Sequence, residues 1–431
     1  MSNRGDGMKI FAFILFVLMY ILMIAKPAYR PFYALAVAVI FLLLGILPPD
    51  CLMSTINWNV LLMMSGTMII VYYFIDSHMP SLLADILLKK SRNFMWVTIL
   101  MSLFAGMISA LIDNVATVLM VAPVGMAICK KLKISPVGII LSIAVSSNLQ
   151  GAATLVGDTT SIMLGDYADM NFMNFFWMKG RPGIFFAVEL GTIATIPVMM
   201  FLFRKEKAPV STREKTSVSI NNYVPTAMLL LMVASLIAAS FIPDSPPMIN
   251  GVICCLLALI TVLIDLIQEK NADCAIAAFK NLDFETLGLL LGLFIVIGGL
   301  TNAGIIDDFA NLIIHFGGNN KFLLYTIVVW GSVLISAFVD NIPYVATMLP
   351  VLTAVTTTLS MEPYLLYFGL LSGATLGGNI TPIGASANIT AVGLLKKEGY
   401  QVSFKDFIQI GIPYTLTAVI TGYLYFWFIW A

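Results

Sequence analysis

The chain has few of the residues on which soluble enzymes and nucleic-acid-binding proteins depend. Only 11% of its 431 residues are charged, the formal net charge is zero, and there are two histidines. A balanced charge offers no electrostatic footprint for nucleic acid. The five cysteines form no CxxC pair, so the sequence indicates neither a zinc site nor a disulfide framework, and no cofactor beyond a coupling ion.

Two catalytic signatures are missing as well. No Gly-x(4)-Gly-Lys-Ser/Thr motif is present, so an ATP-driven mechanism would need a separate ATPase subunit. An intramembrane aspartyl protease would carry Gly-x-Gly-Asp, but the segment ending at Asp158 has Leu155 at the first glycine position. We therefore expect a protein that is not an enzyme.

Apolar residues make up 60% of the chain, and the mean hydropathy is +0.96. Windows of about 17–20 apolar residues are long enough to cross a bilayer core. We expect an all-α polytopic membrane protein in the cell membrane, with the lipid bilayer as its partner. Its predicted spans are 9–26, 32–48, 58–76, 135–165, 183–203, 223–242, 248–268, 284–303, 363–395 and 408–430. The first could be a signal peptide, but no small-x-small cleavage site follows it, so we keep it as a helix.

The sequence contains an internal repeat. The segment 109–124 reappears, altered, as 336–351, with a shared Ser-Ala, Asp-Asn and Pro-Val and an offset of 227 positions. The same offset carries Gly151, Thr154 and Gly157 onto Gly378, Thr381 and Gly384. Such a pattern in an apolar chain is typical of inverted-repeat secondary transporters. We expect a first repeat at 1–203, a cytoplasmic linker at 204–222 and a second repeat at 223–431.

Two apolar stretches, 94–129 and 320–359, are awkward as ordinary spans because each carries Asp-Asn in its middle. We predict re-entrant hairpins with Asp-Asn at the tip, since irregular backbone at that depth must be buried or line a cavity. Spans 135–165 and 363–395 contain glycines and small polar residues and are predicted to be discontinuous helices. Segments 80–90 and 304–316 read as interfacial helices.

The distribution of basic residues sets the orientation. With the first hairpin entering from the cytoplasm, all but five of the 23 Lys and Arg residues lie on the cytoplasmic side. The five exceptions are Arg4, Lys9, Lys179, Arg181 and Lys321. Both termini are then extracytoplasmic.

Asp113 and Asp340 are the strongest functional candidates, because a carboxylate at the membrane centre costs roughly 2.5–3.5 kcal/mol. The alternative is that each caps the second arm of its hairpin by accepting backbone N–H bonds. Both roles are compatible. The neighbouring Asn114 and Asn341 can add carbonyl oxygens for a small hard cation such as Na⁺, so these four residues are the candidate metal ligands.

The second repeated patch supplies the remaining candidates, and close helix packing is their alternative role. Asp158 stands where the second half has Ala385, so the first half is more acidic and could carry protons; a cap paired with Thr160 or Ser161 is the alternative. The full set of candidate ion- or substrate-binding residues is Asp113, Asn114, Thr117, Asn148, Thr154, Gly157, Asp158, Thr159, Thr160, Asp340, Asn341, Asn379, Thr381, Gly384, Ser386 and Asn388.

At the segments 109–115, 336–343 and 376–388 the chain resembles an ion-transporter superfamily. That superfamily includes arsenite permeases, NhaD-type sodium/proton antiporters, the melanosomal P protein and the divalent anion/sodium symporters. Asp-Asn at both tips is similar to the arsenite-permease and P-protein branch, whereas the dicarboxylate symporters show Ser-Asn-Thr there. The resemblance implies a homodimer with an elevator mechanism. Residues 157–161 depart from the superfamily's usual Gly-x-Pro/Ala-x-Asn ending.

The negative charge of the candidate site residues favours some substrates over others. Two like charges about 4 Å apart cost roughly 4 kcal/mol at an effective dielectric of 20, and no arginine lies near the tips in the sequence to bind a substrate carboxylate. We predict an ion-coupled secondary transporter of a small inorganic ion or metalloid, arsenite or Na⁺, coupled to H⁺ or Na⁺. The alternatives are a sodium-coupled citrate-like symporter, which would carry a small anion, and a passive ion channel.

Overall fold

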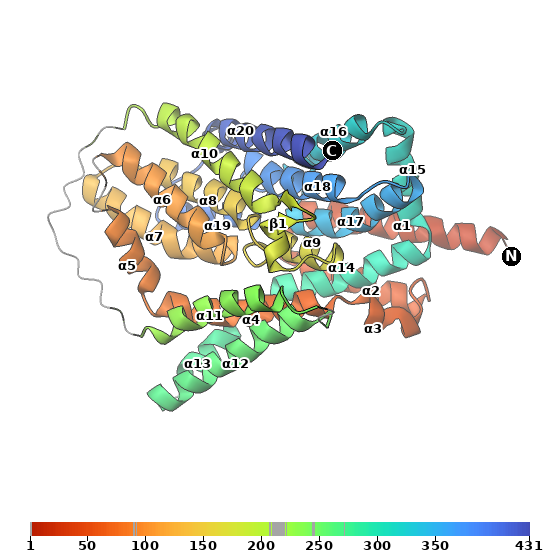
Figure 1. Ribbon diagram of the computed structural model, residues 1–431, viewed down its shortest axis with the longest axis horizontal. Coiled ribbons are helices and arrows are strands. Elements are labelled where there is room, and N and C mark those ends of the chain that lie inside the picture. The colour runs from red at the N-terminus through yellow and green to blue at the C-terminus, as the bar shows by residue number, and fades with distance from the viewer. Residues whose placement is uncertain are drawn as a thin grey trace.

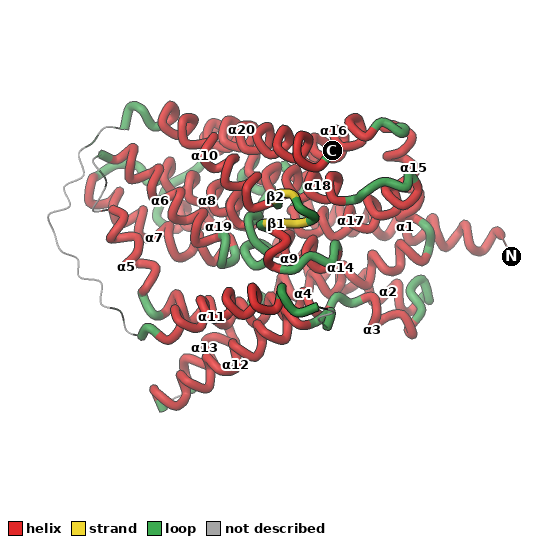
Figure 2. The backbone as a smooth tube through the Cα atoms, in the orientation of Figure 1, coloured by secondary structure: helices red, strands yellow, loops and turns green. Residues whose placement is uncertain are grey.

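The computed structural model of the chain describes residues 2–88, 91, 93–206, 208, 220, 222–243, 246–270 and 272–431. Helices account for most of the described chain, with one two-stranded antiparallel hairpin (Figures 1 and 2). The all-α expectation is confirmed. Most of the predicted linker 204–222 lies outside the described residues.

The elements of the first half are α1 (Ser2–Ala25), η1 (Pro27–Tyr29), α2 (Arg30–Leu43), η2 (Pro49–Cys51), α3 (Leu52–Thr55), α4 (Trp58–Asp76), α5 (Met79–Leu88), α6 (Phe94–Ser109), α7 (Asn114–Leu132), α8 (Val137–Gly151), α9 (Thr159–Tyr167), η3 (Phe172–Phe175), β1 (Trp177–Met178), β2 (Arg181–Pro182) and α10 (Ile184–Leu202). Those of the second half are α11 (Val224–Ala239), α12 (Ile249–Glu269), α13 (Asp273–Lys280), α14 (Phe284–Asn302), α15 (Ile305–Gly317), α16 (Lys321–Ser336), α17 (Asn341–Thr358), α18 (Tyr364–Gly377), η4 (Gly378–Ile380), α19 (Ser386–Lys397) and α20 (Phe404–Trp430).

Seven helices of the described chain are long and apolar enough to cross a membrane: α1 from Gly7 onward, α4, α7, α10, α12, α14 and α20. The predicted spans 135–165 and 363–395 are each broken, into α8 and α9 and into α18 and α19. The interfacial prediction at 304–316 coincides with α15, which meets α16 at a bend of 118°. Helices α2 and α11 are shorter than the spans expected there.

The repeat seen in the sequence reappears in the order of the helices. Helices α16, α17, α18 and α19 each begin 227 positions after α6, α7, α8 and α9, respectively. Their caps repeat too, because Asn93 and Asn320 cap the first arm of each hairpin and Asp113 and Asp340 cap the second. The packing repeats as well: α4 lies against α12 as α14 lies against α2, and α6 lies against α8 as α16 lies against α18.

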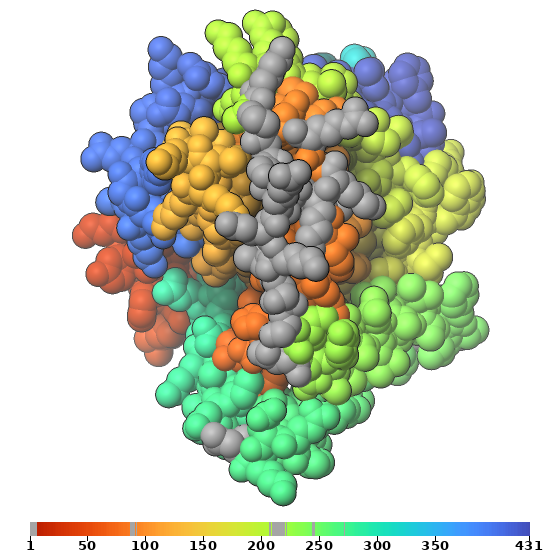
Figure 3. Space-filling view, turned by 90° about the vertical axis from the view of Figure 1, so that its left-hand side faces the viewer, coloured from red at the N-terminus to blue at the C-terminus, as the bar shows by residue number. Residues whose placement is uncertain are grey.

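Helices α8 and α18, the first parts of the two broken helices, lie in the middle of the molecule with most of their residues buried. In Figure 1, α4, α11 and α12 run along one long side and α10 and α20 along the opposite side. Figure 3 looks onto the end where segments of both halves come together. Large apolar side chains remain exposed on the outer helices, including Leu190 and Ile193 on α10 and Leu259 and Leu263 on α12. These faces suit contact with lipid tails.

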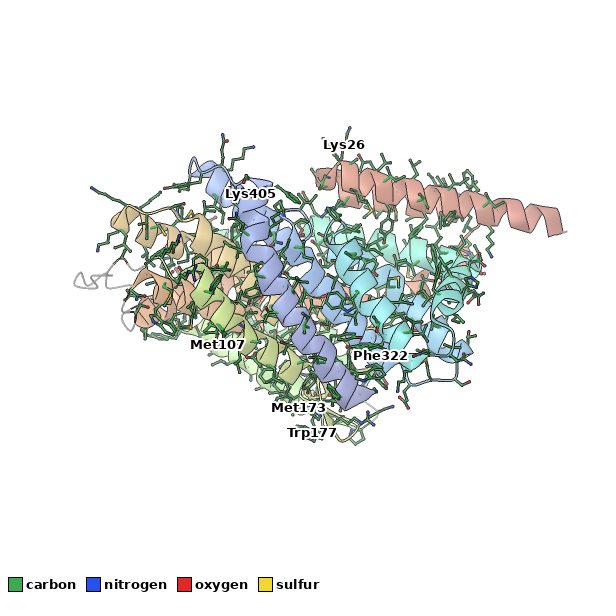
Figure 4. The ribbon with its side chains drawn as sticks, turned by 90° about the horizontal axis from the view of Figure 1, so that it is seen from above. Lys26, Met107, Met173, Trp177, Phe322 and Lys405 are labelled. Carbon is green, nitrogen blue, oxygen red and sulfur yellow. The ribbon has the colours of Figure 1, made fainter. Side chains whose placement is uncertain are left out.

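Three exposed ion pairs agree with the predicted sidedness of the loops. Lys9 pairs with Asp308, Lys130 with Glu398 and Lys179 with Glu362, at 2.6, 2.6 and 2.9 Å. In each pair the predicted layout places both residues on one side of the membrane. Figure 4 shows Lys26 and Lys405 at one edge of the molecule and Met173 and Trp177 at the opposite edge.

Both breaks in the discontinuous helices are packed against the hairpin tips through a glycine. A Cβ on Gly384 would lie 2.6 Å from the carbonyl oxygen of Gly378 and 2.8 Å from those of Ser336 and Ala337. A Cβ on Gly157 would likewise lie 2.5–2.9 Å from the equivalent carbonyl oxygens of the first half. Because backbone atoms cannot move aside cheaply, only glycine fits, which gives these two candidate ligands a packing role.

We predict that Gly384→Ala destabilises the protein by about 1–3 kcal/mol, the usual cost of an overpacked site. Gly331→Ala on α16 is the matched control, because nothing lies within 4 Å of its Cβ position. It should leave the protein unchanged or slightly more stable. Thermal unfolding of the detergent-solubilised variants measures both. Equal melting temperatures for the two variants would contradict the packing role.

Candidate functional site

Asp113 lies at the tip of the first hairpin, where α6 ends and α7 begins. Its carboxylate accepts hydrogen bonds from the backbone N–H groups of Val115 and Ala116 at 2.9 and 3.2 Å. The tip is held against the broken helix by Thr154, whose hydroxyl donates to the carbonyl of Ala110. The capping role is therefore present. It leaves the rest of the half-buried carboxylate free for a ligand.

Asp340 occupies the equivalent position in the second hairpin but has different partners. Its carboxylate accepts from the backbone N–H of Ile342 at 3.1 Å, from the hydroxyl of Ser386 at 3.0 Å and from Nη1 of Arg30 at 2.8 Å. The side chain of Asp340 is 2% exposed and that of Arg30 is 12% exposed. Asp340 is thus a buried carboxylate with its charge already balanced.

The expectation that no arginine lies near the tips was therefore wrong. The distribution of basic residues assigned Arg30 to the cytoplasmic side, between the predicted spans 9–26 and 32–48. In the structure this segment forms η1, and Arg30 begins α2 with its guanidinium directed to a carboxylate 310 positions away. Sequence proximity could not reveal a partner so distant.

Four buried asparagines form a hydrogen-bonded network that joins the two halves. Asn114 donates to Asn148 at 2.8 Å, and Asn148 donates to the side-chain oxygens of Asn379 and Asn388 at 2.7 and 3.1 Å. The amides of Asn379 and Asn388 donate onward to backbone carbonyls. All four had been singled out as ligands, and the structure brings them together. Their amide groups are engaged with one another and with the backbone.

Asp158 lies at the break between α8 and α9 and is 3% exposed. Its side chain accepts from the hydroxyl of Thr160 at 2.6 Å, and Thr160 is 3.1 Å from the hydroxyl of Thr375 in the second half. Asp158 makes no capping bond to α9. The alternative role, a cap paired with Thr160 or Ser161, is thus met in part: the pairing with Thr160 is present and a capping hydrogen bond is not.

A cavity of about 470 Å³ connects the two acids of the first half. It is bounded by α4, α7, α9 and the loop before α14, and Asp113, Asp158 and Thr159 line it together with Asp76 and Asp283. No lysine or arginine is among the described residues that line it, and none in the described chain forms an ion pair with Asp113 or Asp158. The cavity is therefore electronegative and attracts cations.

A second cavity, of about 590 Å³, lies at the opposite ends of α4 and α9. The carboxylate of Asp166 faces it and accepts from the amides of Asn57 and Asn59, the latter at 2.6 Å. Sequence analysis missed this cluster. The Asn-x-Asn spacing at the start of α4 was visible, but its acidic partner is more than a hundred positions away.

The remaining candidates do not converge on one point. Thr381 donates to the carbonyl of Ala337 and repeats the role of Thr154. The hydroxyl of Thr117 and the amide nitrogen of Asn341 are buried without a hydrogen-bond partner. No group of three or more His, Cys, Asp or Glu side chains suited to a metal ion occurs in the described part of the chain. The Na⁺ ligand set proposed from the sequence is divided between the two tips.

The sequence matches a known family over nearly its whole length. A family described as "Citrate transporter" matches residues 20–272 and 250–431. The chain belongs to the citrate transporter family. Its function class is transport rather than catalysis.

Individual relatives agree with this assignment. An uncharacterised transporter of Mycobacterium tuberculosis is 28% identical over 97% of this chain and 98% of its own length. The human P protein is 24% identical over 86% of this chain and 53% of its own length, which confirms the resemblance stated above. The YdaH transporter of Alcanivorax borkumensis has the same fold, with a TM-score of 0.59 at 14% identity, over 96% of this chain and 97% of that one.

The asparagine network gives a test of what joins the halves. We predict that Asn148→Ala destabilises the protein by roughly 1–3 kcal/mol for each amide group left unpaired. Asn311→Ala, on the exposed face of α15, is the control and should change the stability by less than about 0.5 kcal/mol. Thermal unfolding in detergent measures the difference. If Asn148→Ala melts with the control, the network does not hold the halves together.

Proposed function

We propose that this member of the family is a cation-coupled secondary active transporter that binds its coupling ion, Na⁺ or H⁺, at Asp113 and Asp158. The observation that carries the proposal is the contrast between the two tips. Asp340 has an arginine partner, whereas Asp113 and Asp158 share an acidic cavity with no described basic residue beside them. Binding a mobile cation or a proton would lower the electrostatic repulsion between two carboxylates that have no resident counter-charge.

The same charge argument bears on the cargo. Two carboxylates about 4 Å apart repel each other by roughly 4 kcal/mol at an effective dielectric of 20, and the cavity contains four. A bare polyanion entering it would add to that repulsion. We therefore propose a small inorganic cation, or a neutral metalloid such as arsenous acid, exchanged against H⁺ or Na⁺.

A citrate-like tricarboxylate is the second candidate, and the family match favours it. Such a substrate could enter the acidic cavity only after cations had neutralised the carboxylates. Its transport would therefore require cations that bind first and travel with it.

We further propose that the motion is an elevator movement within an inverted repeat. The moving part would comprise both hairpins and both broken helices, α6–α9 and α16–α19, and the stationary part α1, α2, α4, α11, α12 and α14. Its support is that the members of each group pack mainly on one another. A homodimer, as the resemblance implies, would have twice the chain's mass by light scattering in detergent.

The transport prediction concerns proteoliposomes that contain an internal pH dye and receive Na⁺, Li⁺, arsenite or citrate in turn. Asp113→Asn and Asp158→Asn should each lower cation-dependent flux at least about tenfold, the equivalent of ~1.4 kcal/mol. Asp308→Asn is the control, because its pair with Lys9 is exposed and worth little. The active substrate distinguishes the two cargo candidates, and saturable counterflow distinguishes a carrier from a channel. Full coupled flux in both site variants would refute the proposed ion site.

The orientation can be tested separately with cysteines introduced into a variant without native cysteines. Glu362→Cys, in the loop between α17 and α18, should react with a membrane-impermeant maleimide added outside the cell. Lys280→Cys, at the end of α13, should react only after the membrane is opened, because we propose that this end and the linker 204–222 face the cytoplasm. The reverse labelling pattern would invert the topology.

A further inference from the structure

The aspartates at the two hairpin tips have the same capping role but differ in whether a basic side chain pairs with them. Asp113 and Asp340 each cap the second arm of their hairpin, 227 positions apart. Asp113 lies beside a cavity with no ion-pair partner among the described residues, whereas Asp340 is paired with Arg30. The difference does not come from the repeated segments themselves, since Arg30 belongs to α2, outside the hairpin and the broken helix that it contacts.

Arg30 is held firmly in this position. Pro31 follows it in the first turn of α2, and η1 precedes it. Tyr20 fixes the adjacent α1 to the same hairpin arm. Its hydroxyl donates to the carbonyl of Pro343 at 2.7 Å and lies 2.8 Å from the hydroxyl of Thr347. Arg30 thus stands between α1, which is bonded to the same hairpin arm as Asp340, and α2, which packs on α14.

The surroundings of Asp340 are those of a ligated carboxylate. One oxygen receives the Arg30 Nη1 and the Ser386 hydroxyl, and the other receives the backbone N–H of Ile342. A guanidinium keeps its charge at any pH the protein meets, so this neutralisation needs nothing from solution. A bound cation at the first tip would balance the charge of Asp113 in the same way.

We propose that Arg30 is a tethered cation that occupies, at the second tip, the place that a mobile coupling cation takes at the first. The inference rests on the proposed function. It adds that, in the conformation described here, only the first half takes a cation from solution. Arg30 is then a residue that sets the number of coupling ions, and removing its charge converts Asp340 into a second cation site.

The experiment measures cation-dependent thermal stabilisation of the full chain in detergent. NaCl, LiCl and MgCl₂ are compared with choline chloride at constant ionic strength. The starting protein is the double variant Asp113→Asn/Asp158→Asn, which removes the first-half site and should lose the cation-dependent rise in melting temperature seen in the parent. Adding Arg30→Gln should restore a cation-dependent rise, and adding Asp340→Asn to that variant should abolish it again.

The results separate the two proposals. A folded, monodisperse Arg30→Gln variant with no cation-dependent rise overturns the inference. A parent without any cation response, or a response that survives in Asp113→Asn/Asp158→Asn, refutes the first-half site. A response gained through Arg30→Gln would support the role of Arg30 even then.

A neutral replacement of the pair covers the case in which Arg30→Gln does not fold. Arg30→Gln/Asp340→Asn leaves no unpaired charge, so it should fold and retain the parent's full cation response. A weaker response would mean that Asp340 binds a mobile cation in the parent, which would overturn the inference.

Discussion

The cost of burying a carboxylate is the constraint on which the centre of this molecule depends. Removing such a group from water costs several kcal/mol unless charge and hydrogen bonds compensate. Asp340, at 2% exposure, receives an arginine, a hydroxyl and a backbone N–H. Asp113 receives two backbone N–H groups and keeps contact with a cavity. The cost is therefore met differently at the two tips: Asp340 has a resident counter-charge, whereas Asp113 remains in contact with a cavity.

Buried asparagine and threonine side chains between the two tips form hydrogen bonds with one another. Asn148 joins the first tip to the second broken helix through Asn114, Asn379 and Asn388, and Thr160 meets Thr375 across the same boundary. A buried polar network whose members are paired in this way stabilises one arrangement of the core. The charge at this centre lies on the carboxylates and on Arg30.

Much of this arrangement followed from the sequence, because the repeat located both tips and both helix breaks without any structure. Asp113 and Asp340 as caps, and the breaks at Gly157 and Gly384, are local features, fixed by residues a few positions apart. Arg30 escaped prediction because its partner is 310 positions away and nothing in its local sequence distinguishes it from a loop arginine. The hydrogen bonds of Asn57 and Asn59 to Asp166 were not predicted for the same reason.

The contacts between the two halves at this centre bear on the elevator movement proposed above. Helix α7 packs on α19 and α9 on α17, so each hairpin arm is locked to the broken helix of the other half. Asn148 adds hydrogen bonds across the same boundary. Displacing one hairpin alone would leave these buried amides unpaired, whereas displacing both together would preserve them. A joint displacement must instead break the contacts that hold the hairpins and broken helices to the surrounding helices. These include the pair of Arg30 with Asp340, the bonds of Tyr20 to the α17 arm and those of Asn57 and Asn59 to Asp166. Separating Arg30 from Asp340 leaves a buried carboxylate without its counter-charge, at a cost of about 3–5 kcal/mol. The charge balance of the second tip therefore adds an electrostatic cost to the elevator movement proposed above.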